Sequence, residues 1–136
     1  MSNTNQKGDI GEAAFVLEAA LKGYWTAKMP QDCPYDYMLD KKDGKLLRVQ
    51  VKYRAINKAG TVIVKLVHHK KHSGANRRNY DSSNVDAVAI YVPDHKKTYL
   101  IPISQMPNMD EITFRCIPAK NNQTNNVRLI EVYSTW

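Results

Sequence analysis

Two alternating segments joined by a tight turn constrain the fold of this chain most. Apolar residues occupy every second position of residues 33–40 and again of residues 46–54, with Lys41-Lys42-Asp43-Gly44 between them. Alternation with a period of two is typical of a strand with one buried face, and Asp-Gly is a frequent hairpin turn. The sequence therefore predicts two adjacent antiparallel strands in the first half of the chain.

A helix is predicted before this hairpin, over residues 8–22. Its apolar residues recur at helical spacing, and no proline interrupts them. They are Ile10, Ala13, Ala14, Leu17 and Leu21. Gly23 is a suitable residue to end the helix.

Further strands are predicted around and after this unit. They cover residues 24–29, 61–67, 85–92 and 98–103, with two weaker candidates at 112–117 and 127–132. The polar, basic segment 68–80 is predicted to be a loop. We expect an α/β (α+β) fold, in which the N-terminal helix packs on a mixed central sheet and the first strands form an antiparallel meander. No change in composition divides the 136 residues, so one domain over 1–136 is expected.

Positive charge is concentrated in the middle of the chain. The whole chain carries 20 Lys plus Arg against 13 Asp plus Glu, a formal net charge of +7. Residues 41–78 hold twelve basic residues and one acid, a balance of +11 that leaves −4 for the rest. A basic surface of this kind favours a polyanion, most often nucleic acid. The alternative is a solvated basic face with no ligand.

Ten basic residues are candidates for contacts with double-stranded DNA, because Arg suits guanine edges and Lys suits phosphates. They are Arg48, Arg54, Lys65, His68, His69, Lys70, Lys71, His72, Arg77 and Arg78. The two cysteines cannot build a disulfide scaffold, and no apolar run resembles a signal peptide or a membrane span. A cytoplasmic protein that associates with the nucleoid rather than with a membrane is expected.

The predicted hairpin brings together residues that suit phosphodiester hydrolysis. Asp36 lies on its first strand, and the second strand presents Gln50 and Lys52 on one face because they are two residues apart. Glu12, on the preceding helix, is placed to approach from the side. A hard divalent cation takes oxygen ligands, here Asp36, the Gln50 side chain and the Val51 carbonyl. Lys52 is the candidate ammonium that stabilises the anionic centre or steers the attacking water.

Several segments resemble a known family, the PD-(D/E)XK nucleases. Pro34-Tyr35-Asp36, followed after thirteen residues by Gln50-Val51-Lys52, is similar to the family motif. Residues 7–12 are similar to the start of the family's first helix, where a Glu often joins the metal site, and this resemblance implies that Glu12 is a further metal ligand. Residues 85–92 and 98–102 resemble the downstream strands of one subgroup, the homing endonucleases encoded in bacterial group I introns, which have archaeal and phage relatives.

This resemblance implies a restriction-endonuclease-like core and a sequence-specific DNA endonuclease that uses Mg²⁺ or Mn²⁺. Cleavage of both strands by so small a chain implies a homo-oligomer, a dimer or a tetramer. A Holliday-junction resolvase or a restriction-type nuclease on the same fold is an alternative. A non-catalytic DNA-binding domain is an alternative of a different class.

Two positions depart from the family motif. Tyr35 separates Pro34 from Asp36, and Gln50 stands where the second acid is found. An amide is a poorer metal ligand than a carboxylate, so Gln50 is expected to weaken ion binding. Gln50 is either natural, as in the homing subgroup, or an inactivating replacement of Glu, and the sequence leaves both readings open.

Overall fold

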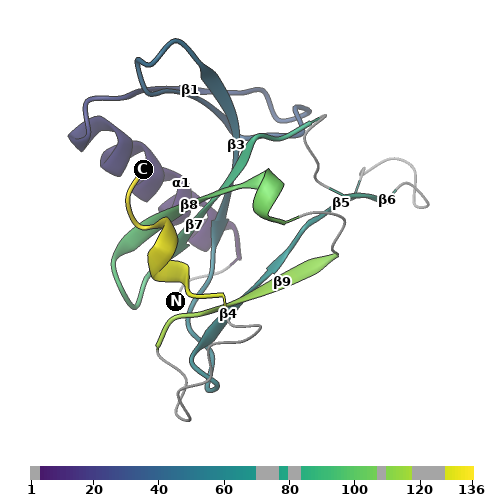
Figure 1. Ribbon diagram of the computed structural model, residues 1–136. Helices are drawn as coiled ribbons and strands as arrows, with labels where there is room; N and C mark the ends of the chain where they lie inside the picture. The colour runs from purple at the N-terminus through teal and green to yellow at the C-terminus, as the bar shows by residue number, and fades with distance from the viewer. Residues whose placement is uncertain (1–3, 70–76, 80–83, 107–109, 118–127) are drawn as a thin grey trace.

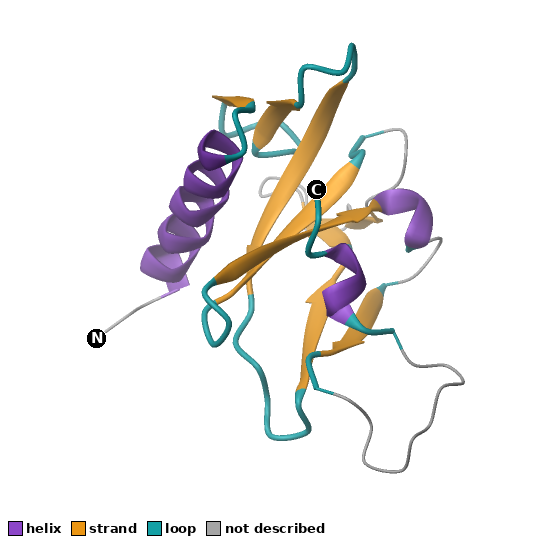
Figure 2. Cartoon of the chain, turned by 60° about the vertical axis from the view of Figure 1, so that its left-hand side comes forward, coloured by secondary structure: helices purple, strands orange, loops and turns teal. Residues whose placement is uncertain are grey.

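The computed structural model describes residues 4–69, 77–79, 84–106, 110–117 and 128–136 (Figure 1). A single sheet of five strands forms its centre, in the order β1-β2-β3-β7-β8. These strands are β1 (Trp25–Lys28), β2 (Tyr37–Asp40), β3 (Leu46–Tyr53), β7 (Ala87–Val92) and β8 (Lys97–Pro102). Helix α1 (Thr4–Leu21) packs on one face of this sheet (Figure 2). The expected N-terminal helix on a mixed central sheet is confirmed.

Strand directions make the sheet mixed. β1, β2 and β3 pair antiparallel, as the Asp43-Gly44 turn predicts, and Gly44 adopts the positive φ of 89° that such a turn favours. β3 then pairs with β7 in parallel, and β8 returns antiparallel along β7 to form the edge. The predicted meander was wrong beyond β3, because the next strand leaves the sheet instead of pairing with it.

The other four described strands form two separate two-stranded ribbons. β4 (Thr61–Lys65) pairs with β9 (Glu111–Arg115), and β5 (Val67–His69) pairs with β6 (Arg77–Asn79), both antiparallel. The predicted loop over 68–80 therefore contains strand residues at both ends, while 70–76 and 80 lie outside the described residues. The predicted strand over 127–132 was wrong in its described part, because Ile130–Tyr133 form a short 3₁₀ helix, η2. A second 3₁₀ helix, η1 (Ile103–Gln105), follows β8.

Apolar residues cover both faces of the central sheet. On the α1 face, Phe15 packs among Leu39, Val49 and the small residues Ala87 and Ala89. On the other face, the alternate residues of β7 and β8 pack against the β4–β9 ribbon; these include Val88, Ile90, Ile101, Val62 and Phe114. The alternation of alanines with larger residues along β7 lets α1 approach one face closely while the other face fills the larger core.

The helix buries a different stripe from the one its spacing highlighted. Gly11, Phe15 and Ala19 face the sheet, and a Cβ on Gly11 would lie 3.4 Å from Tyr53 Cβ. Leu17 is 61 % exposed and Leu21 is 79 % exposed, although both belong to the apolar series that predicted the helix. None of the described helices is both long and apolar enough to cross a membrane.

Candidate active site

Asp36 lies at the point where β2 begins to pair with β3. The prediction that its strand starts at residue 33 was wrong, because β2 begins at Tyr37 and Asp36 precedes it. Its backbone N–H donates to the Val49 carbonyl at 2.9 Å, and its Oδ2 accepts the Val51 N–H at 2.8 Å. The Asp36 carboxylate therefore accepts the Val51 hydrogen bond in place of a backbone carbonyl of β2. This bond fixes the carboxylate beside β3.

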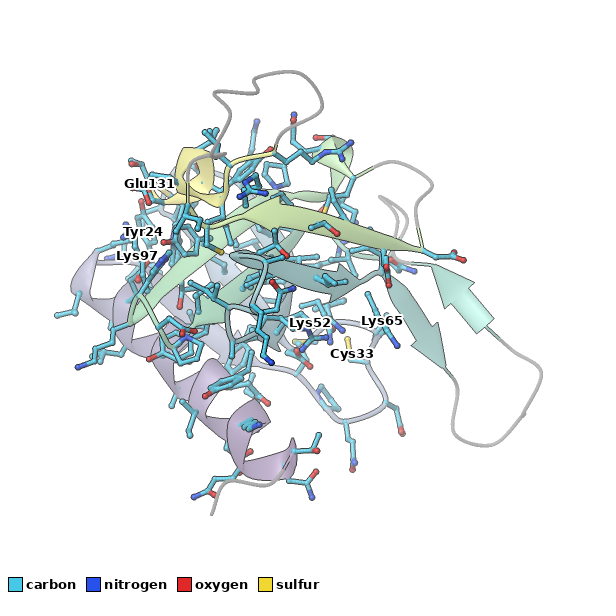
Figure 3. All side chains as sticks on the ribbon, turned by 90° about the horizontal axis from the view of Figure 1, so that it is seen from below. Tyr24, Cys33, Lys52, Lys65, Lys97 and Glu131 are labelled. Carbon is cyan, nitrogen blue, oxygen red and sulfur yellow. The ribbon has the colours of Figure 1, made fainter. Side chains whose placement is uncertain are left out.

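Strand β3 presents three groups to this position. Gln50 and Lys52 lie two residues apart on the face opposite the α1 cluster, and both are half-buried. The Val51 carbonyl points to the same edge of the strand as its N–H, the edge that Asp36 occupies. Figure 3 labels Lys52 in the same part of the view as Cys33, whose loop leads to Asp36. The structure thus brings Asp36 and Lys52 together, as the hairpin predicted.

Glu12 reaches the site from α1. The Tyr37 hydroxyl hydrogen-bonds its carboxylate, and Lys28 Nζ lies 3.4 Å from its Oε1. Lys28 and Tyr37 are register partners on β1 and β2, so the two groups approach Glu12 from adjacent strands. In addition to burial, the negative charge of Glu12 raises the pKa of Asp36, so the two carboxylates lie close enough to interact.

Burial dominates the ionisation of the site. It raises the pKa of Asp36, and the charge of Glu12 raises it further, against the Val51 hydrogen bond and the charges of Lys52 and Lys28. Burial likewise lowers the pKa of Lys52 to about 8, aided by Arg54 and opposed by Asp36. Burial and the neighbouring Glu12 raise the pKa of Tyr37 to about 12, so its hydroxyl stays a donor. A carboxylate pair whose negative charge is only partly compensated is suited to a cation.

The donor set fits a hard divalent cation. Asp36, Glu12, the Gln50 side chain and the Val51 carbonyl all offer oxygen, as Mg²⁺ and Mn²⁺ require. Among the described residues, no group of three or more His, Cys, Asp or Glu could hold a metal ion. The described site thus contains two carboxylates, and an amide stands where a third would complete them. An ion held here would depend on neutral oxygens and water for its remaining ligands.

Three of the predicted DNA contacts lie on or next to strands β3 and β4. Arg48 forms a two-pronged ion pair with Asp86 on the way into β7, with its Nε 3.0 Å from Oδ2 and its second terminal nitrogen 3.0 Å from Oδ1. Arg54 donates to the Ile63 and Tyr53 carbonyls, and Lys65 is exposed on β4. Besides burial, the charge of Arg54 lowers the pKa of Lys52, so Arg54 borders the Asp36 site, whereas the Arg48 side chain is engaged by Asp86.

The remaining candidates follow β4. His68 and His69 belong to β5, and Arg77 and Arg78 to β6, paired as His68 with Arg78 and His69 with Arg77. Lys70, Lys71 and His72 lie outside the described residues. The two-stranded ribbon brings the basic residues at the two ends of this segment side by side, which the prediction of a loop did not anticipate.

Sequence reasoning missed two residues of the site, Lys28 and Tyr37. Both interact with Glu12, and their placement depends on the register between β1 and β2. A Lys near the end of a short strand carries no motif, and Tyr37 was assigned to an apolar strand face. The tyrosine hydroxyl on a predicted buried face was the one available signal, because a buried hydroxyl needs a partner.

Comparison with known proteins places these features in context. Residues 2–136 match the model of a family described as PD-(D/E)XK endonuclease. Among solved structures, a bacterial homing endonuclease, I-Ssp6803I, is similar with a TM-score of 0.74 and 22 % sequence identity, covering 97 % of this chain and 88 % of that chain. At this identity, the likeness shows a shared fold. No curated protein matches the chain.

Proposed function

The chain belongs to the PD-(D/E)XK endonuclease family, and we propose that it hydrolyses phosphodiester bonds of double-stranded DNA with a divalent cation at the Asp36 site. One observation carries the assignment of the site. The 2.8 Å hydrogen bond from the Val51 N–H to Asp36 fixes a carboxylate beside the strand segment that bears Gln50 and Lys52. Glu12 completes the set from the helix.

Each residue of the site has a role that its position supports. Asp36 and Glu12 would hold the cation, with the Gln50 side chain and the Val51 carbonyl as neutral ligands. When bound, the ion would lower the pKa of a water ligand and neutralise charge on the phosphate. Lys52 is half-buried beside Asp36, where its ammonium would stabilise negative charge that develops on the phosphate oxygens. Tyr37 would orient Glu12, and Lys28 would balance part of its charge until a cation binds.

Recognition of one long DNA sequence is the finer part of this proposal. The shared fold with a homing endonuclease supports it, as does the basic balance of residues 41–78. The β5–β6 ribbon pairs His68 with Arg78 and His69 with Arg77, and these basic residues would contact DNA. Such an enzyme would work on nucleoid DNA in the cytoplasm of its host.

Cleavage assays on purified protein test the proposal. Supercoiled plasmid and genomic DNA should be nicked or linearised with Mg²⁺ or Mn²⁺ and protected by chelator. Asp36→Ala and Lys52→Ala should each lower cleavage at least about 100-fold while largely sparing DNA binding. Asp32→Ala and Lys58→Ala, which alter an exposed acid and an exposed lysine near the site strands, are the matched controls.

The DNA cleavage products distinguish a homing enzyme from a resolvase and from a restriction-type nuclease. Sequencing the ends released from genomic DNA should give one long site for a homing enzyme. Preference for four-way junctions of any sequence would indicate a resolvase, and a short recurring site a restriction-type nuclease. Full cleavage by both alanine variants would refute the site. Absence of cleavage on duplex, branched and single-stranded DNA would identify a binding domain in which Gln50 marks a decayed site.

A further inference from the structure

The outer face of α1 is apolar, uncharged and exposed. Helical geometry places Ile10 and Leu21 within about 40° of Leu17 around the helix axis. Their side chains are exposed by 39 %, 61 % and 79 % in the order Ile10, Leu17, Leu21. The residues between them on this face are Ala13, Ala14 and Ala20. No charged residue lies within about 60° of Leu17 between Ile10 and Leu21.

A surface helix of a single domain normally has one apolar face. Here Gly11, Phe15 and Ala19 already bury the inner face of α1 against the sheet. Figure 2 shows the helix along one side of the sheet, with no described helix or strand on its far side. A second apolar face, opposite the buried one, is typical of a helix that is covered on both sides. Large exposed leucines on an uncharged face therefore indicate that this face is covered in the functional assembly.

The charges that border this face fit a second copy of the chain. Lys7 and Asp9 are exposed and lie about 80° to either side of Leu17, on opposite edges of the face. A two-fold axis parallel to α1 places Lys7 of one copy at the same edge and nearly the same height as Asp9 of the other. The arrangement repeats on the second edge, so the face is complementary to itself.

We propose that two copies of the chain pair in parallel through the outer face of α1, with Leu17 and Leu21 in contact towards its C-terminal end and Lys7–Asp9 pairs at both edges near its N-terminal end. The proposed function supports the same occupant, and to that extent the inference rests on it. Each chain carries one Asp36 site, whereas cleavage of both DNA strands needs two. The contact is smaller than a standard interface, so a micromolar dissociation constant is expected.

Sedimentation equilibrium without DNA or metal tests the pairing. Wild type should associate to a dimer, and the double variant Leu17→Glu, Leu21→Glu should weaken the dimer about 100-fold or more. Val132→Glu is the matched control, because Val132 is 71 % exposed on η2 and lies outside this face. Circular dichroism checks that each variant is folded. A monomeric wild type well above micromolar concentration, or a leucine variant that still dimerises, would overturn the proposal.

A charge exchange tests the partner and the orientation. Lys7→Glu alone and Asp9→Lys alone each place like charges at both edges, and each should weaken its own dimer several-fold. An equimolar mixture of the two variants should form a heterodimer of near wild-type affinity, because both edges then regain opposite charges. Failure of the mixture to recover would contradict the parallel pairing. A different partner protein would show no such recovery.

The outcomes for pairing and for cleavage are separable. Asp36→Ala should dimerise like wild type, since Asp36 directly precedes β2 and is not part of the outer face of α1. A dimer that cleaves no DNA would refute the nuclease proposal and leave the pairing intact. A monomer that nicks DNA would refute the pairing alone. If both proposals hold, the glutamate variant of the helix should nick plasmid and lose most of its linearisation.

Discussion

Lys28 Nζ lies 3.4 Å from Glu12 Oε1, so a lysine of β1 neutralises part of the negative charge at the Asp36 site. The same ammonium lowers the pKa of Asp36. Lys28 is 69 % exposed while Glu12 is 26 % exposed, so the lysine is the mobile partner of the pair. An arriving cation would therefore compete with a flexible side chain for the Glu12 carboxylate.

Removal of this lysine should strengthen metal binding. Lys28→Met is expected to lower the dissociation constant for Mn²⁺ about threefold, because the competing charge is exposed and screened. Titration calorimetry without DNA measures it. Lys58→Met, in the exposed turn before β4, is the control and should not change it. Weaker metal binding in the Lys28 variant would show that the lysine organises the site instead of competing for it.

The tyrosine that binds Glu12 should matter for cleavage. Tyr37→Phe removes the hydroxyl that donates to Glu12, and we expect about a tenfold loss of cleavage with a higher metal requirement. Tyr24→Phe is the matched control, because it removes a hydroxyl that donates to the Trp136 carbonyl at 3.1 Å, outside the site. Both variants should lose about 1 kcal/mol of stability. Equal cleavage rates for the two variants would argue against a positioning role for Tyr37.

Asp86 should stabilise the fold in a pH-dependent manner. Hydrogen bonds from the Arg48 side chain and backbone hold the pKa of Asp86 below its usual value. A depressed folded-state pKa stabilises the protein above the unfolded-state pKa, and this stabilisation is lost as the pH falls through the folded value. Asp86→Asn should cost about 1–3 kcal/mol at neutral pH and little in acid.

Urea unfolding of wild type and variant at several pH values measures this effect. The difference between them should shrink steadily as the pH falls below about 4. Asp32→Asn alters an exposed acid and should follow the wild-type curve. A constant difference across this range would show that Asp86 contributes through packing and not through its charge.

Asp36 should stabilise the protein less than a neutral side chain. Burial raises its pKa, so the ionised carboxylate is disfavoured in the folded state relative to the unfolded chain, and the unfavourable effect is present at neutral pH. Asp36→Asn keeps an oxygen for the Val51 N–H and should raise Tm by about 2–4 °C without metal. Differential scanning calorimetry measures this shift. A lower Tm would mean that the charge contributes favourably to folding.

Local periodicity predicted the site strand well. The alternation over residues 46–54 gave β3 to within one residue, and the pairing of β2 with β3 followed from the Asp43-Gly44 turn. Those signals act within about twenty residues of the chain, so they can be read from sequence. The assignments of metal and catalytic roles to Asp36, Gln50, Lys52 and Glu12 remain predictions.

Local periodicity could not predict two other features, the buried face of α1 and the pairing of β3 with β7. α1 is apolar on both faces, so its spacing predicts a helix but does not choose between the stripe with Leu17 and the stripe with Phe15. The parallel pairing of β3 with β7 joins residues 49–53 to residues 87–91, and the intervening strand β4 carries the same alternation as a strand of the central sheet. Such pairing is decided by tertiary packing, which short-range periodicity does not encode.

Strand β3 is hydrogen-bonded by β2 on one edge and by β7 on the other. The backbone at residue 50 is therefore held by its neighbours, and Gln and Glu have nearly the same shape. Their codons differ by one nucleotide, so a single transversion would add a third carboxylate without moving the scaffold. The protein thus stands one inherited substitution from a site with three carboxylates, on a backbone that need not move to accept it.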